Sequence, residues 1–145
     1  MLDVGAGSGI LAMVALRLGA ASALGVECDP VAVDCARDYA TENGFGDNLE
    51  FRCGTLEEID RQSELGPDLV LANLDRQTLL LLCDEQARYV SHGARLLLSG
   101  ILLDQEQEIV EAFSKVGAML SQRRGQEGWV GLELLMVKSC EGVGV

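Results

Sequence analysis

The chain has 145 residues, of which 48% are hydrophobic, and its 23 acidic and 11 basic residues give a formal net charge of −12 at pH 7. This length predicts one globular domain with a buried core, and the composition excludes a disordered chain. The acidic balance argues against direct binding of nucleic acid and favours a basic partner, and no apolar stretch approaches the roughly 20 residues of a membrane span.

Apolar runs of strand length alternate with amphipathic segments, which predicts an α/β fold built on a parallel sheet. The first expected elements are a strand at 1–5, a helix at 9–18, a strand at 23–27, a helix at 30–42 and a strand at 49–53. A polar stretch at 54–64 separates these from a strand at 68–73, a helix at 76–89, a strand at 94–99 and a helix at 104–117. Antiparallel strands at 118–122 and 129–137, joined by a polar glycine loop, are expected to follow.

Two helix starts carry specific signals. Asp29 before Pro30 predicts an N-cap followed by proline at the first helical position. Asp104 with Gln107 has the spacing of a capping box. The sequence therefore predicts that both helices begin at these residues.

The most informative motif is a run of glycines between the first strand and the first helix. Gly5, Gly7 and Gly9 give the spacing G-x-G-x-G, and Asp3 lies two residues before the first of them. Glycines let the backbone approach a bound nucleotide closely. A dinucleotide-binding turn reads G-x-G-x-x-G and would need glycine at Ile10, so the spacing argues against a dinucleotide. The alternative is a tight strand-to-helix turn with no ligand.

Glu27 lies roughly 20 residues after the glycine run, at the end of the second expected strand. An acidic side chain at this place can accept hydrogen bonds from ribose hydroxyls. If the glycine run were only a tight strand-to-helix turn with no ligand, it would give no reason for an acid at residue 27. Asp29 is a competing acid, which we assign to helix capping because Pro30 follows it directly.

The glycine spacing, with Asp3 before it, resembles motif I of the class I S-adenosylmethionine-dependent methyltransferases. Residues 2–12 resemble the opening of the PrmA-like enzymes, which methylate large-subunit ribosomal protein eleven. Further stretches similar to this family lie at residues 25–33, 70–74, 98–102 with Gln105, and 127–130.

The resemblance implies a Rossmann-like class I methyltransferase fold, a mostly parallel sheet that ends in an antiparallel hairpin. Residues 1–138 are expected to form the S-adenosylmethionine-binding domain, and residues 139–145 a disordered tail. The family also carries an N-terminal docking domain and a helix before the first strand, which this sequence lacks, so we expect a fragment or a truncated protein. The uncovered sheet face would then favour a homodimer.

S-adenosylmethionine is the cofactor that the resemblance implies, and no metal is expected. Gly5 and Gly7 would lie against its methionine part, Glu27 would hold its ribose, and Thr55 would border its adenine. Asn73 is the implied catalytic residue, presenting its side chain to the acceptor nitrogen, and its alternative is an Asx turn that closes the strand. The implied cofactor-binding residues are Asp3, Gly5, Gly7, Gly9, Glu27, Thr55 and Asn73.

The implied activity is N-methylation of a lysine or N-terminal amine on a basic protein such as a ribosomal protein, in the cytoplasm. Two alternatives stay open: a non-catalytic interaction module, and a methyltransferase of a small-molecule amine. Trp129 would either wall the acceptor pocket or belong to the core.

The cysteines form no C-x-x-C pair and their number, five, is odd. This pattern predicts reduced thiols in a cytosolic protein and argues against a disulfide framework or a zinc site. Most of them are expected to be small core residues.

Overall fold

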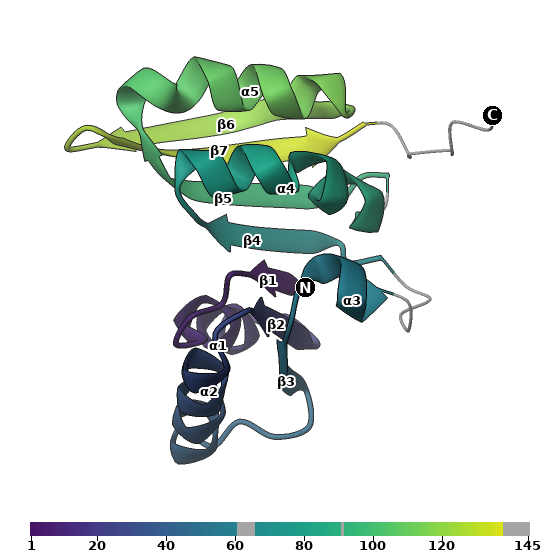
Figure 1. The fold of residues 1–145 in the computed structure, drawn as a ribbon, viewed down its shortest axis with the longest axis vertical. Helices are drawn as coiled ribbons and strands as arrows, with labels where there is room; N and C mark the ends of the chain where they lie inside the picture. Colours follow the sequence, from purple (N-terminus) through teal and green to yellow (C-terminus); the bar gives the residue numbers. More distant parts are fainter. Residues whose placement is uncertain (61–65, 91, 138–145) are drawn as a thin grey trace. The chain divides into compact units, whose positions relative to one another are not determined.

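The computed structural model describes residues 1–60, 66–90 and 92–137 (Figure 1). The chain divides into two compact units, Met1–Leu65 and Gly66–Val145. The first unit contains β1 (Leu2–Val4), α1 (Ile10–Arg17), β2 (Ala23–Glu27), α2 (Pro30–Glu42), β3 (Leu49–Cys53) and α3 (Leu56–Asp60). The second contains β4 (Leu69–Asn73), α4 (Arg76–Tyr89), β5 (Arg95–Leu102), the 3-10 turn η1 (Leu103–Gln105), α5 (Glu106–Lys115), β6 (Ala118–Gln126) and β7 (Trp129–Met136).

The first unit is a parallel sheet in the order β3-β2-β1, with Leu2 opposite Leu24 and Ala23 opposite Leu49. Its core is made mostly of small side chains, which let helices approach the sheet closely; among its buried members Phe51 supplies a large ring, and the partly buried Phe45 packs against them. The core residues are Ala6, Ala12, Met13, Ala23, Val33, Ala36, Ala40 and Phe51.

Helix α2 begins and ends as the sequence predicts. The Asp29 carboxylate accepts a hydrogen bond from the Val31 N–H at 2.9 Å, and Pro30 occupies the first turn. The helix ends at Glu42, and Gly44 follows with a φ of +74°. The assignment of Asp29 to helix capping is therefore confirmed.

The second unit joins a parallel pair, β4 and β5, to an antiparallel ribbon in the order β4-β5-β7-β6. Alternate residues of β7 are buried, so one face of this strand packs against the core, whereas β6 is exposed after its first residue, Ala118. The two hairpin residues, Glu127 and Gly128, have φ values of +51° and +85°. A two-residue turn of this kind lets β6 stay paired with β7 up to Gln126, so the strand is longer than predicted. The predicted α/β fold class, parallel with an antiparallel end, is confirmed.

Two local predictions are wrong. The polar stretch after β3 contains the helix α3, which the sequence analysis did not predict. At the start of α5, Asp104 and Gln107 form no capping box: the Leu102 N–H donates to Gln105 Oε1 at 3.1 Å instead. The Gln107 side chain donates to Glu111 Oε1 at 2.9 Å, so it is not available to cap the helix.

The prediction that most cysteines are small core residues is also wrong for three of the four that the structure describes. Cys28, Cys35 and Cys53 are exposed, and Cys83 is buried. Cys28 comes directly after β2, and Cys53 is the last residue of β3. Cys140 and the predicted tail at 139–145 lie outside the described residues.

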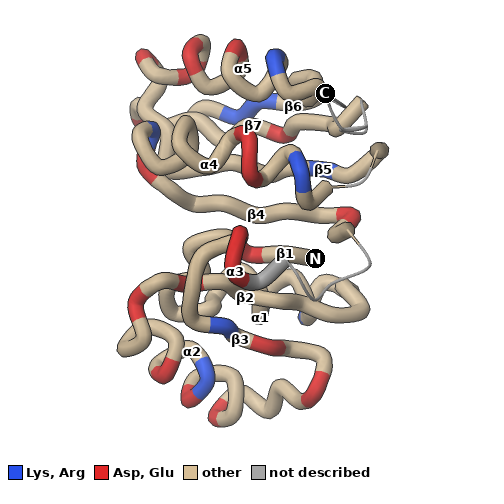
Figure 2. The backbone as a smooth tube through the Cα atoms, turned by 45° about the vertical axis from the view of Figure 1, so that its right-hand side comes forward, with Lys and Arg blue, Asp and Glu red and all other residues tan. Residues whose placement is uncertain are grey.

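Acidic residues are spread over both units, and basic residues are fewer (Figure 2). In the ranges that the structure describes, none of the helices combines the length and apolar character needed to cross a membrane.

Candidate functional site

The turn between β1 and α1 takes its shape from three glycines. Gly5, Gly7 and Gly9 have φ values of +70°, +53° and +78°, a region that other residues rarely adopt. The N–H groups of Gly5 and Ala6 both donate to the Val26 carbonyl, at 2.9 and 3.0 Å. The turn is therefore anchored to the end of β2, where Glu27 follows.

The Glu27 carboxylate lies at this turn. Its Oε2 accepts a hydrogen bond from the Gly7 N–H at 2.9 Å, and its Oε1 accepts one from the Asp29 N–H at 3.1 Å. The side chain is half-buried, and each oxygen keeps further lone pairs for a ligand. Two backbone donors thus hold a negative charge beside the glycine turn.

Gly7 and Gly9 are glycines for different reasons. A Cβ at Gly7 would meet no atom within 4 Å, so this part of the turn faces open space. A Cβ at Gly9 would overlap the Phe51 ring, and so would a Cβ at Gly25. The structure therefore gives Gly9 a packing role beneath the turn, whereas Gly7 leaves room for close approach of another molecule. The predicted contact between Gly9 and the cofactor stays a prediction.

Asp3 lies beneath the turn, where only 1% of its surface is exposed. Its Oδ2 accepts a hydrogen bond from the Ala12 N–H at 3.2 Å, which links β1 to α1. Burial raises the pKa of Asp3 to about 6, against the lowering effect of the Ala12 hydrogen bond, and the nearby Glu27 charge raises it further. The carboxyl group thus supports the turn from inside.

Thr55 forms a reciprocal capping box with Glu58. The Thr55 N–H and hydroxyl donate to Glu58 Oε2 at 2.9 and 3.2 Å, and the Glu58 N–H donates to the Thr55 hydroxyl at 3.4 Å. This capping box explains why α3 forms where the sequence analysis expected only a polar stretch. The threonine and glutamate three residues apart were the available signal. Contact of Thr55 with adenine stays a prediction.

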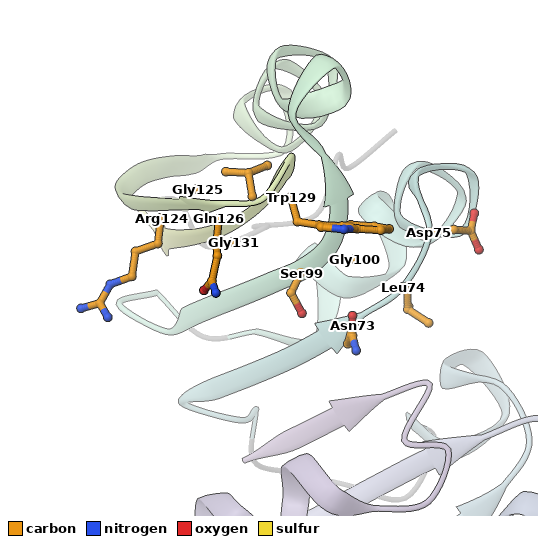
Figure 3. A pocket seen from close by; sticks show the side chains of 11 residues that line it. Asn73, Leu74, Asp75, Ser99, Gly100, Arg124, Gly125, Gln126, Trp129 and Gly131 are labelled. Carbon is orange, nitrogen blue, oxygen red and sulfur yellow. The ribbon is translucent and has the colours of Figure 1, made fainter.

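The second unit holds an open hollow of about 900 Å³ next to the end of β4 (Figure 3). Figure 3 shows the Asn73, Ser99 and Trp129 side chains at its border, with Arg124 extending away from them. The lining residues are Asn73, Leu74, Asp75, Ser99, Gly100, Arg124, Gly125, Gln126, Trp129, Val130 and Gly131. Sequence reasoning singled out Asn73 and Trp129 and assigned no role to Arg124 or Gln126, since their place depends on the hairpin.

Two side chains at this hollow are accessible to a ligand: the polar carboxamide of Asn73 and the aromatic ring of Trp129. Asn73 is exposed, and within the described residues its carboxamide makes no hydrogen bond, so an Asx turn does not account for it. Trp129 is 53% exposed, so the core interpretation is wrong. Alternation along β7 buries the next residue, Val130, and turns the indole outward.

Comparison with known proteins identifies the family of this chain. Residues 1–136 match the family profile described as ribosomal protein L11 methyltransferase (PrmA). The chain belongs to this family. It is 36% identical over 132 residues to the ribosomal protein L11 methyltransferase of Symbiobacterium thermophilum, covering 91% of this chain and 42% of that protein. It is 39% identical over 140 residues to that of Deinococcus radiodurans, covering 94% and 51%.

A solved structure of the same family is similar over nearly the whole chain. The ribosomal protein L11 methylase from Lactobacillus delbrueckii subsp. bulgaricus has a TM-score of 0.85 and 27% identity, covering 94% of this chain and 69% of that chain. Several more distant methyltransferases share the fold, such as an RNA methyltransferase from Salinibacter ruber (TM-score 0.74, 24% identity, covering 94% of this chain and 80% of that chain). The family resemblance is confirmed, and the chain spans about half or less of the length of these two curated relatives.

Proposed function

We propose that this chain is the methyl-transferring part of an enzyme that uses S-adenosylmethionine to methylate an amino group of a basic protein. The relatives are named for methylation of ribosomal protein L11, and we propose the same class of substrate here, in the cytoplasm. The observation that carries the proposal is the Glu27 carboxylate held by the Gly7 N–H, beside a turn whose outer side is open.

The residues around the glycine turn fit a nucleoside with a positively charged substituent. Gly5 and Gly7 would lie against its methionine part, with open space at Gly7, and the free lone pairs of Glu27 would accept the ribose hydroxyls. Asp3 would act indirectly, by supporting the turn, Gly9 would contact the cofactor as the family resemblance implies, and Thr55 would border the adenine. When bound, S-adenosylmethionine would supply a methyl group attached to a positively charged sulfonium sulfur, which is a good leaving group.

The acceptor would be held by Asn73 and Trp129. The Asn73 carbonyl oxygen can accept a hydrogen bond from an amine N–H and so orient the nitrogen lone pair, which is catalysis by positioning. The Trp129 face suits the aliphatic stem of a lysine. A lysine must lose a proton first, because its ordinary pKa is about 10.4, and desolvation against the indole favours the neutral amine.

Asp75 lines the same hollow and is not the base for this proton. Its two carboxylate oxygens accept hydrogen bonds from the Thr78 N–H and hydroxyl, at 3.1 and 2.8 Å. The hydroxyl hydrogen bond, followed by the backbone one, lowers the pKa of Asp75. A carboxylate that is already satisfied and weakly basic is a poor proton acceptor, so we propose that the proton leaves to water.

Titration calorimetry of the chain with S-adenosylhomocysteine tests the cofactor part of the proposal. We expect one molecule to bind per chain, and a folded chain that binds none would contradict it. Incubation with S-adenosylmethionine and either ribosomal protein L11 or small amines, followed by mass spectrometry, tests the acceptor. Methylation of small amines alone would favour a methyltransferase of a small-molecule amine. Cofactor binding without methyl transfer to either acceptor would favour a non-catalytic interaction module.

The predicted homodimer through an uncovered sheet face also stays a proposal. Size-exclusion chromatography with light scattering tests it directly. A monomer at all concentrations would contradict it.

A further inference from the structure

We propose that Gly100 is a positioning residue that sets the orientation of the Asn73 carboxamide. Gly100 has a φ of +82°, and a Cβ placed on it would lie 2.9 Å from Asn73 Oδ1 and 2.7 Å from the Leu74 carbonyl oxygen. Both distances are shorter than real Cβ contacts, so the bare Cα of Gly100 is what leaves room for the Asn73 oxygen. This inference rests on the role proposed for Asn73 in methyl transfer.

The close approach follows from an irregularity in β5. The parallel pairing of β4 with β5 runs up to Asn73 opposite Ser99, and the Leu74 N–H then donates to the Ser99 carbonyl at 3.1 Å. On the other side of β5, the register with β7 shifts between Leu98 and Ile101. A bulge at this place turns the backbone and brings Gly100 against the end of β4.

The close approach of Gly100 is the restraint that the structure shows on the otherwise exposed Asn73 side chain. Its carboxamide makes no hydrogen bond to the described residues, so no donor or acceptor fixes its direction. The Gly100 Cα and the Leu74 carbonyl bound the space on one side of Oδ1. A methyl group at residue 100 would occupy this space and turn the carboxamide away from its present direction.

The expected effect is on the chemical step. A displacement of about 1 Å of a positioning group can cost roughly 100-fold in rate, so we expect Gly100→Ala to lower kcat by about 10- to 100-fold. Affinity for S-adenosylhomocysteine should fall much less than kcat does, because the glycine turn and Glu27 carry most of the proposed cofactor contacts and Asn73 at most one.

Gly93→Ala is the matched control. Gly93 lies in the same unit with a φ of +86°, close to that of Gly100, but a Cβ there would meet no atom within 4 Å. Both variants pay the backbone cost of an alanine in the left-handed region, and only Gly100→Ala crowds Asn73 and the Leu74 carbonyl beside it. Similar losses of kcat in the two variants would overturn the inference.

The double variant Asn73→Ala/Gly100→Ala separates positioning from a general structural effect. If Gly100 acts through Asn73, adding Gly100→Ala to Asn73→Ala should lower kcat by less than about twofold further. Multiplied losses would overturn the inference. Full activity of Asn73→Ala alone would instead contradict the proposed function of Asn73, so the two failures are distinguishable.

A measurement on the unchanged chain covers the case in which Gly100→Ala does not fold. The side-chain amide signals of Asn73, assigned in nitrogen-15 spectra by their loss in Asn73→Ala, report whether the carboxamide holds one orientation. We expect restricted motion, with relaxation close to that of the β4 backbone. Free rotation of this carboxamide on the picosecond to nanosecond timescale would overturn the inference.

Discussion

Glu27 Oε2 lies 2.9 Å from the backbone nitrogen of Gly7, so the acid at the end of β2 is held by the turn that follows β1. A preformed arrangement of this kind lowers the cost of ordering the side chain when a ligand binds. The hydrogen bond also gives a physical reason for finding both features in one chain: the glycine run and the acid are 20 residues apart in sequence but in contact in the fold.

Glu27→Ala should weaken binding of S-adenosylhomocysteine far more than Asp29→Ala. A hydrogen bond to a charged group is worth about 1.5–3 kcal/mol, which corresponds to roughly 10- to 150-fold in affinity. Asp29→Ala should instead cost about 1 kcal/mol of unfolding free energy through the lost α2 cap, with affinity nearly unchanged. Calorimetry and urea unfolding of both variants test this, and equal losses of affinity would show that Glu27 does not hold the ribose.

Gly9→Ala should destabilise the fold more than Gly7→Ala. Both variants strain a left-handed residue, at about 1 kcal/mol, but an alanine Cβ at Gly9 also overlaps the Phe51 ring and adds about 1–3 kcal/mol of overpacking. The smaller side chain of Phe51→Leu should recover part of the loss in the double variant. Urea midpoints measure these effects. Additive losses in the double variant would contradict the proposed clash.

Asp3 should make the fold less stable as the pH rises from about 4 to about 6. Its pKa is raised from 3.8 in the unfolded chain to about 6 in the fold, so the folded chain binds the proton more tightly. The stabilisation is present below pH 4 and is lost as the pH rises through 6, and it amounts to about 3 kcal/mol.

Asp3→Asn keeps an oxygen for the Ala12 N–H and removes the titration. The difference in unfolding free energy between Asp3→Asn and the unchanged chain, followed by urea unfolding from pH 4 to pH 7, isolates this residue from the other acids. The variant should gain relative stability as the pH rises. A constant difference would show that the pKa of Asp3 is not raised.

Trp129 offers a direct probe of acceptor binding because it is the single tryptophan of the chain. Its half-exposed indole should shift to shorter emission wavelengths when a lysine-containing substrate peptide covers it. Trp129→Ala should lower kcat/KM for the acceptor roughly tenfold through the lost aromatic contact, whereas Trp129→Phe should retain most of it. Affinity for S-adenosylhomocysteine should stay the same in both variants. If a peptide that the chain methylates leaves the emission wavelength of Trp129 unchanged, the role of Trp129 is contradicted.

The local sequence by itself determined the order of strands and helices, the glycine turn, the acid at the end of β2 and the α2 cap. These features depend on residues that are close together, such as Asp29 before Pro30, or on a hydrophobic period that one segment carries alone. The family resemblance added the cofactor and Asn73 as hypotheses. The α3 capping box between Thr55 and Glu58 was also local and could have been predicted.

Tertiary structure alone decided which glycine serves which purpose and which polar groups are free. Gly9 needs the Phe51 ring from β3 to explain it, and Gly100 needs the end of β4, and neither partner is near in sequence. The burial that raises the pKa of Asp3 depends likewise on packing across segments, and the exposure of Trp129 depends on which face of β7 the rest of the fold covers. Close approach between distant segments is a property of the folded chain, because sequence patterns specify which face a residue takes but not which atoms it meets there.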